Sequence, residues 1–215
     1  MGAYYSAARL AARAVLGLLS RWEVRGREHV PRGGGFIVAS NHTSYWDPPM
    51  VGAAVPREVH YLAKEELFST PVVGALVRSV NSIPIRRGAA DLSGLARAIA
   101  TLKSGGGLVL FPEGSRMKDG ELHPARPGVG LMAVQADVPV VPCYISGSNR
   151  PRRWLTRRGR VRIWLGMARH WRELAGPDVE PVPGRVLYQR VGEAVMREIA
   201  ALKSGQERSA TRGAA

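Results

Sequence analysis

The sequence predicts a single α/β domain in which a mixed, largely parallel sheet is flanked by helices. Short runs of β-branched and aliphatic residues alternate with longer helical patterns along the chain, which is typical of strands joined by covering helices. The chain has 215 residues, and 45% of them are hydrophobic. This is enough for one substantial core and short for two, so we expect one folded domain.

The chain begins with an amphipathic pattern over residues 4–22. Its apolar side chains are interrupted by Arg9, Arg13 and Arg21, so no stretch reaches the roughly 18–20 apolar residues that a membrane-spanning helix requires. The pattern predicts a helix over residues 1–21 that lies at a membrane interface. Packing of this helix against the domain stays open as the alternative. The apolar residues of the segment are Tyr4, Tyr5, Leu10, Val15, Leu16, Leu18, Leu19 and Trp22.

Short apolar runs predict the strands of the sheet, and two apolar stripes predict its main helices. In residues 89–103 and 185–203, apolar side chains recur at helical spacing, which indicates packing against the core. Gly105, Gly106 and Gly107 end the first helix. Residues 204–215 are polar and small, which predicts a disordered tail after a domain over residues 22–203. The expected strands cover residues 22–27, 35–40, 58–63, 82–85, 107–111, 139–145 and 160–165.

The charge of the chain is strongly positive. Its 31 Lys and Arg residues against 17 Asp and Glu residues give a formal charge of +14, which favours polyanionic partners such as nucleic acid, anionic lipid or phosphorylated metabolites. Cys143 is the single cysteine, so an intramolecular disulfide and a cysteine-based zinc site are excluded. We expect neither a metal nor a bound cofactor.

Residues 40–49 place a histidine after an expected strand and an aspartate before an expected helix. Pro48 suits the first helical position, so Asp47 is expected at the N-cap. The turn between strand and helix can bring His42 and Asp47 together, with Asp47 fixing one imidazole nitrogen and leaving the other as a base. On this segment alone, a capping aspartate beside an unrelated histidine is an equal alternative.

Three further polar segments follow expected strands directly. They are Lys64-Glu65-Glu66, Arg86-Arg87-Gly88 and Pro112-Glu113-Gly114-Ser115-Arg116. Because the carboxyl ends of parallel strands meet at one edge of a sheet, where open α/β sheets bind ligands, these segments should converge on His42. The sequence therefore predicts a base, several cations and a carboxylate at one site.

Four ordered blocks resemble the motifs of the PlsC-like 1-acyl-glycerol-3-phosphate acyltransferases. Asn41-His42-x-x-x-x-Asp47 is similar to that family's first motif, and residues 83–88 (Ile-Pro-Ile-Arg-Arg-Gly) are similar to its arginine-bearing second motif. Residues 111–116 (Phe-Pro-Glu-Gly-Ser-Arg) and 138–142 (Val-Pro-Val-Val-Pro) resemble the third and fourth. The resemblance spans about residues 22–150.

The resemblance implies an enzyme of phospholipid biosynthesis that uses an acyl thioester, either acyl-CoA or acyl-carrier protein. It would acylate the sn-2 hydroxyl of lysophosphatidic acid and form phosphatidic acid, with His42 as general base and Asp47 orienting it. The acceptor would be bound by Arg87, Glu113, Gly114, Ser115, Arg116 and Lys64. The two arginines are the expected primary phosphate ligands, because a guanidinium donates two parallel hydrogen bonds. The fourth block, with Val138, Pro139 and Pro142, would belong to the region of the acyl donor or its channel.

Two departures from the family's motifs leave the acceptor open. Asn81 stands where glycine is frequent, and Arg86 stands where an acidic residue is common. The alternative acceptors are another lysolipid or glycerol 3-phosphate. An inactive basic protein that binds lipid or nucleic acid is the alternative of a different class, and the intact pair of His42 and Asp47 argues against it.

The segment from Val138 to Arg172 contains no acidic residue and combines many arginines with Trp154, Trp164 and Trp171. Such a surface suits nucleic acid, through phosphate contacts and base stacking, or an anionic bilayer, through head groups and interfacial tryptophans. The acyltransferase-like blocks favour lipid, so we expect a peripheral or monotopic protein on the cytoplasmic face of a membrane and no nucleic-acid partner. The arginines are Arg150, Arg152, Arg153, Arg157, Arg158, Arg160, Arg162, Arg169 and Arg172.

Overall fold

The computed structural model describes residues 3–86, 91–177 and 182–212, and its centre is one seven-stranded sheet. The strand order is β1-β7-β6-β2-β5-β3-β4, and every neighbouring pair is parallel except β6 with β7. The predicted mixed, largely parallel sheet is confirmed. The strands are β1 (Arg21–Arg25), β2 (Phe36–Ser40), β3 (Val59–Lys64), β4 (Ser82–Ile85), β5 (Gly107–Leu110), β6 (Val140–Ser146) and β7 (Arg160–Leu165).

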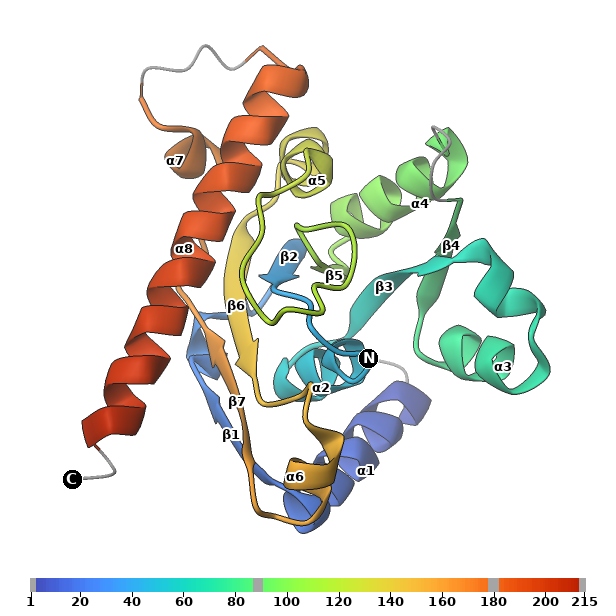
Figure 1. The fold of residues 1–215 in the computed structure, drawn as a ribbon. Helices are drawn as coiled ribbons and strands as arrows, with labels where there is room; N and C mark the ends of the chain where they lie inside the picture. Colours follow the sequence, from blue (N-terminus) through green and yellow to red (C-terminus); the bar gives the residue numbers. More distant parts are fainter. Residues whose placement is uncertain (1–2, 87–90, 178–181, 213–215) are drawn as a thin grey trace.

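Helices cover both faces of this sheet (Figure 1). On one face, α4, α5, α7 and α8 contribute side chains to a core with Ile37 and Ala39 of β2. On the other face, α1, α2 and α6 pack with Phe36 and Val38 of the same strand. The central strand β2 is therefore buried throughout, as expected for a strand covered on both faces. The helices are α1 (Ala3–Leu19), α2 (Asp47–Ala54), α3 (Pro71–Ser79), α4 (Leu92–Lys103), α5 (Gly128–Ala136), α6 (Pro151–Leu155), α7 (Trp171–Ala175) and α8 (Arg185–Arg212), with 3₁₀ turns η1 (Arg27–His29) and η2 (Glu65–Ser69).

The first helix, α1, packs one side on the domain and leaves apolar residues exposed on the other. Tyr5 is buried, and its hydroxyl accepts the backbone N–H of Val59 at 3.2 Å. Arg9 Nη1 donates to the carbonyl of Val55 at 2.7 Å. Leu10 and Leu18 are 68% and 74% exposed. Within the described residues, no helix has both the length and the apolarity that crossing a bilayer requires.

The prediction of a disordered tail from residue 204 is wrong for residues 204–212, while residues 213–215 lie outside the described part. The helix α8 continues to Arg212 because its last turns have a packing surface on the sheet. Gln206 is buried there; it accepts the hydroxyl of Ser146 at 2.8 Å and donates to the carbonyl of Tyr144 at 3.2 Å. Composition alone did not reveal this contact.

The tryptophans of the basic segment are largely inside the molecule, so they do not form the aromatic membrane surface that the sequence predicted. Trp154 and Trp171 are 2% and 4% exposed. The indole of Trp154 donates to the carbonyl of Ser148 at 3.2 Å, and that of Trp171 donates to Asp137 at 2.7 Å. Their partners lie within a few residues of β6, which the sequence pattern did not indicate.

We predict that Gln206→Ala lowers the free energy of unfolding by about 1–3 kcal/mol, since it leaves buried polar partners without hydrogen bonds. Urea unfolding followed by circular dichroism measures the change. Ser204→Ala, on the exposed side of the same turn, is the control and should be nearly neutral. Equal stabilities of the two variants would contradict a packing role for the end of α8.

Candidate active site

His42 follows the carboxyl end of β2, and a tight turn brings it against Asp47. His42 Nδ1 lies 3.0 Å from Asp47 Oδ2. The same oxygen accepts the backbone N–H groups of Thr43 and Ser44, both at 2.7 Å. Asp47 is fully buried, and its three donors hold the carboxylate in one position. The pairing expected from the sequence is present in the structure.

Asp47 is not the helix N-cap that the sequence predicted. It is the first residue of α2, and Trp46 occupies the N-cap position. The carboxylate points back to the turn instead of to the helix N–H groups, because Thr43 and Ser44 offer it two donors beside the imidazole. With a carboxylate as the partner of Nδ1, the proton belongs on Nδ1 and Nε2 is free to act as a base.

The imidazole of His42 is fixed on a second side by Phe111, which follows β5. The two rings stack with centroids 4.0 Å apart and planes 24° from parallel. The side chain is 14% exposed, so a substrate can reach it. Among the described residues, Nε2 has no hydrogen-bond partner. The imidazole is therefore held in place by Asp47 and Phe111, and its side chain is partly exposed.

Glu113 supports the His42 turn. One carboxylate oxygen accepts the backbone N–H of His42 at 2.9 Å, and the other accepts that of His123 at 3.2 Å. The side chain is 2% exposed. Burial raises the pKa of the Glu113 carboxyl, against the opposing effect of the two N–H donors. We expected Glu113 to bind the acceptor, but both of its oxygens are used in connecting the turn to the β5–α5 loop.

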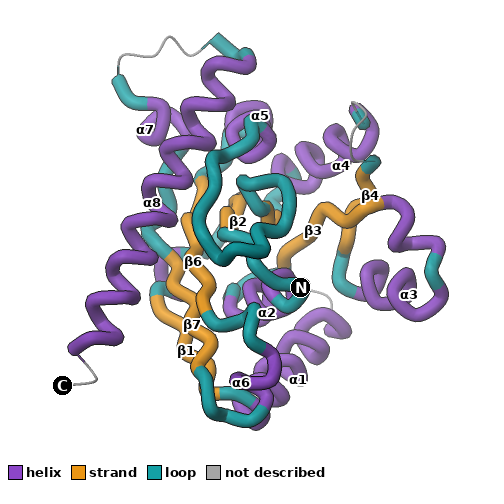
Figure 2. The backbone as a smooth tube through the Cα atoms, in the orientation of Figure 1, coloured by secondary structure: helices purple, strands orange, loops and turns teal. Residues whose placement is uncertain are grey.

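The rest of the third block wraps around the same turn (Figure 2, loop between β5 and α5). Gly114 adopts a φ of +74°, a left-handed conformation that favours glycine. The N–H of Met117 donates to the carbonyl of His42 at 2.7 Å. The guanidinium of Arg116 stacks over the ring of Tyr45 at 3.5 Å. Ser115, between Gly114 and Arg116 in the sequence, is half-buried. The block is thus brought to His42, as the sequence predicted.

Lys64 and Arg86 lie at the same sheet edge, beyond β5. Lys64 ends β3 and pairs in register with Ile85 of β4, which precedes Arg86. Lys64 is exposed, and Arg86 Nε lies 3.3 Å from Glu65 Oε2. Arg87, an expected phosphate ligand, lies outside the described residues.

The fourth block is not at this edge. Val138 and Pro139 precede β6, whose residue Val140 pairs with Ile37 near the start of β2. Since β2 and β6 are parallel, both residues lie at the end of the sheet opposite to His42. Pro142 is buried in β6, opposite Ala39, and its carbonyl accepts the N–H of Gly166 at 2.8 Å. The location of these three residues does not support a direct contact with the reacting acyl group. The fourth block is part of the core instead.

Asn41 has a structural role that the sequence pattern did not indicate. Its amide donates to the carbonyl of Ile145 at 3.0 Å and accepts the N–H of Ile145 at 2.8 Å. The side chain is 1% exposed. It thereby joins β2 to β6 beyond the last backbone pair and fixes the point at which the His42 turn begins. An asparagine directly after the strand Phe-Ile-Val-Ala-Ser was the available signal.

Comparisons with known proteins agree with this geometry. A family model described as Acyltransferase matches residues 21–146. The 1-acyl-sn-glycerol-3-phosphate acyltransferase of Bacillus subtilis is 27% identical over 85% of this chain and 92% of its own length. The alpha form from Ovis aries is 32% identical over 66% of this chain, which spans only 53% of that protein. The crystal structure of the LPA acyltransferase PlsC from Thermotoga maritima superposes with a TM-score of 0.70 at 28% identity, over 93% of this chain and 79% of that one.

Within the described residues, no group of three or more His, Cys, Asp and Glu side chains could hold a metal ion.

We predict that Asn41→Ala lowers the free energy of unfolding by about 2–6 kcal/mol, because it leaves two buried backbone groups of Ile145 unpaired at about 1–3 kcal/mol each. Urea unfolding measures the loss. Asn149→Ala, at an exposed position, is the matched control and should change stability little. A neutral Asn41→Ala would rule out the bridging role.

Proposed function

Because this chain belongs to the acyltransferase family, we propose that it transfers a fatty acyl group from an acyl thioester to the sn-2 hydroxyl of lysophosphatidic acid. The product is phosphatidic acid. The observation that carries this proposal is the ordered pair of His42 and Asp47, in a chain whose relatives from Bacillus subtilis and Thermotoga maritima are named for acylation of this acceptor.

His42 acts as the general base in this proposal. Its Nε2 accepts the proton of the sn-2 hydroxyl while the hydroxyl oxygen attacks the thioester carbonyl carbon. A C–O bond forms, the C–S bond breaks, and the proton on Nε2 passes to the departing sulfur. The buried carboxylate of Asp47 stabilises the transient imidazolium and keeps Nδ1 protonated. The imidazole is neutral again at the end of each cycle.

Direct transfer is favoured over a covalent acyl-enzyme. Cys143 is fully buried in β6, and burial raises the pKa of its thiol to about 12, so it is no nucleophile at neutral pH. Ser44 is 7% exposed and its hydroxyl accepts the N–H of Trp46 at 3.2 Å. Neither side chain is presented to a substrate beside the base.

The phosphate of the acceptor is assigned to the cations on the β5, β3 and β4 side of His42. Arg116 is the best placed of these because its stacking on Tyr45 restricts the guanidinium to one plane and leaves its N–H edge for a bidentate contact. Lys64 and Arg87 complete the proposed phosphate site, and the backbone of Gly114 and Ser115 lines it. Glu113 contributes by holding the His42 turn.

Association with a membrane is the second part of the proposal. The outer side of α1 exposes Leu10, Val15 and Leu18, while its inner side is fixed to the domain. The apolar side of α1 suits insertion at the surface of a bilayer. The net charge of +14 favours a bilayer with anionic head groups. We propose that the chain binds membranes peripherally through α1.

We predict that His42→Ala lowers kcat by about 10²–10⁴-fold, the usual contribution of a general base, and that Asp47→Asn lowers it in the same direction. Purified protein is assayed for phosphatidic acid formed from acyl-CoA and lysophosphatidate, with glycerol 3-phosphate in parallel. The control is His170→Ala at the start of α7, which should keep full activity. Activity retained in a folded His42→Ala would exclude the base assignment.

We predict that the double variant Leu10→Asp/Leu18→Asp loses most of its binding to anionic vesicles. Burial of each leucine in the bilayer contributes about 1.5–3 kcal/mol to the free energy of binding. Vesicle co-sedimentation measures binding. Leu92→Asp on α4 is the control, since Leu92 is 72% exposed on another helix. Unchanged sedimentation of the double variant would show that α1 is not the membrane contact.

A further inference from the structure

A cavity of about 390 Å³ lies against the His42 turn, on the side away from the proposed acceptor phosphate site. Asn41 and Thr43, the neighbours of His42, form part of its wall. The end of β6 forms another part. Since the sheet order is β7-β6-β2-β5-β3-β4, this cavity and the cations Lys64 and Arg86 lie on opposite sides of β2. The lining residues are Asn41, Thr43, Gly120, Tyr144, Ile145, Ser146, Gly147, Asn149, Arg150, Arg153, Gly159 and Arg160.

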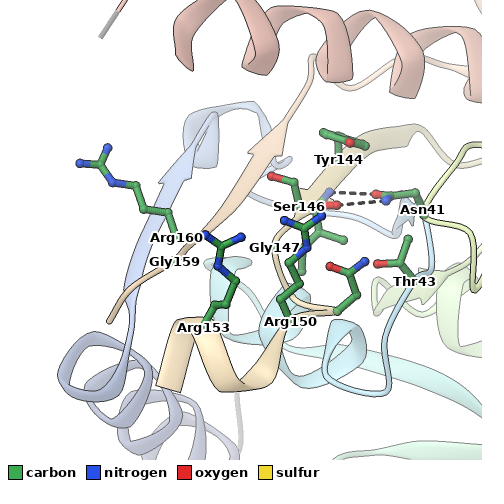
Figure 3. Close-up of a pocket in the computed structure, with 12 residues that line it drawn as sticks. Asn41, Thr43, Tyr144, Ser146, Gly147, Arg150, Arg153, Gly159 and Arg160 are labelled. Atoms are coloured by element: carbon green, nitrogen blue, oxygen red, sulfur yellow. Dashed lines mark hydrogen bonds between the residues drawn. The ribbon is translucent and has the colours of Figure 1, made fainter. Parts of the chain in front are cut away.

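The cavity is positively charged. Arg150, Arg153 and Arg160 are in its lining, which contains no carboxylate among the described residues. Figure 3 shows Arg150 and Arg153 extending toward the end of β6 near Ser146 and Gly147, whereas Arg160 points away from them. Two adjacent guanidinium groups beside hydroxyl and amide side chains favour an anion with several oxygens, such as a phosphate or diphosphate.

The segment that bears these arginines is held by buried contacts. Gly147 has a φ of +84°, and a Cβ there would lie 2.1 Å from the carbonyl of Arg160, so only glycine allows the chain to turn at this point. Trp154, in α6 between Arg153 and the following turn, is 2% exposed and its indole donates to Ser148. Its ring also meets Trp46 edge-on at 5.4 Å. The arginines thus extend from an anchored turn beside the His42 segment.

Direct acyl transfer requires both substrates at His42 at once. The acceptor phosphate is assigned to one side of β2, so the thioester donor has to approach from the other side, where the cavity lies. Acyl thioester donors of both kinds, acyl-CoA and acyl-carrier protein, carry the thioester on a pantetheine arm that ends in phosphate. The neutral arm would lie along Asn41 and Thr43, with its anionic end at the arginines.

We propose that this cavity binds the phosphate-bearing end of the acyl donor, with Arg150 and Arg153 as its ligands. The inference rests on the proposed function, and it gives the basic segment after β6 a role in substrate binding in place of the aromatic membrane surface expected from the sequence.

The test uses the double variant Arg150→Gln/Arg153→Gln, which keeps a polar amide on a shorter side chain and removes two charges. Arg190→Gln/Arg197→Gln on α8 removes the same charge from exposed positions and is the control. Steady-state kinetics give KM for acyl-CoA, for acyl-carrier protein and for lysophosphatidate. Calorimetry with desulfo-CoA measures donor binding without turnover, and anionic vesicles test membrane binding.

The proposal expects a rise of about tenfold or more in KM for acyl-CoA, with KM for lysophosphatidate and kcat nearly unchanged, since charge-assisted phosphate contacts act on donor binding. Desulfo-CoA should bind more weakly by a similar factor, and the control should resemble the wild type. A parallel rise for acyl-carrier protein identifies the pantetheine phosphate as the anion bound, whereas a rise for acyl-CoA alone identifies the nucleotide phosphates.

A rise in KM for lysophosphatidate alone, weaker vesicle binding with unchanged kinetics, or no change at all would each overturn the proposal. Calorimetry distinguishes a failure of the donor-site proposal from a failure of the proposed function. If the wild type forms no phosphatidic acid yet binds desulfo-CoA through these arginines, the acceptor assignment fails and the donor site stands. If it forms phosphatidic acid and the variant binds desulfo-CoA normally, the donor site fails and the function stands.

Discussion

The hydrogen bonds received by one buried oxygen, Asp47 Oδ2, organise the site. It accepts hydrogen bonds from the imidazole of His42 and from two backbone N–H groups of the turn, so the same oxygen shapes the loop and orients the imidazole proposed as the base. The backbone of His42 is fixed as well, through Glu113 on its N–H and Met117 on its carbonyl. With Phe111 stacked on the ring, the histidine is held through its side chain and its main chain. A base restrained in this way needs little reorganisation during proton transfer.

The sheet order gives this base two approaches. Strands β5, β3 and β4 bring their polar ends to one side of β2, and β6 with the following turn brings arginines to the other. Both sides carry positive charge, and both substrates of the proposed reaction are phosphate compounds. In the proposed reaction, this separation would keep the two anions apart while their reactive ends meet at His42. A net charge of +14 fits the proposed binding of two phosphorylated substrates and an anionic surface.

Local sequence signals predicted most of the sheet. Every observed strand lies within two residues of its expected bounds, because short apolar runs between turn residues determine strands directly. The turn between a strand and Pro48 made the pairing of His42 with Asp47 one of two equal alternatives, and the other polar segments and the resemblance favoured it. The signals failed where partners are distant in sequence. They did not reveal that Glu113 accepts the N–H of His42, while its role in acceptor binding stays a prediction, and Trp154 looked interfacial but is buried. The end of α8 looked disordered for the same reason, since Gln206 finds its partners on β6.

The position of Gln206 also bears on the order in which the protein is made. It contacts Ser146, sixty residues earlier in the chain, and Ser146 and Tyr144 belong to the cavity wall beside the His42 turn. A chain that emerges from the ribosome from its N-terminus can assemble β2, the histidine turn and β6 before residue 206 exists. The hydrogen bonds that join Gln206 to Ser146 and Tyr144 then form last, when the end of α8 docks on β6. A fusion partner attached close behind α8 would interfere with this final docking step before it affected the sheet itself.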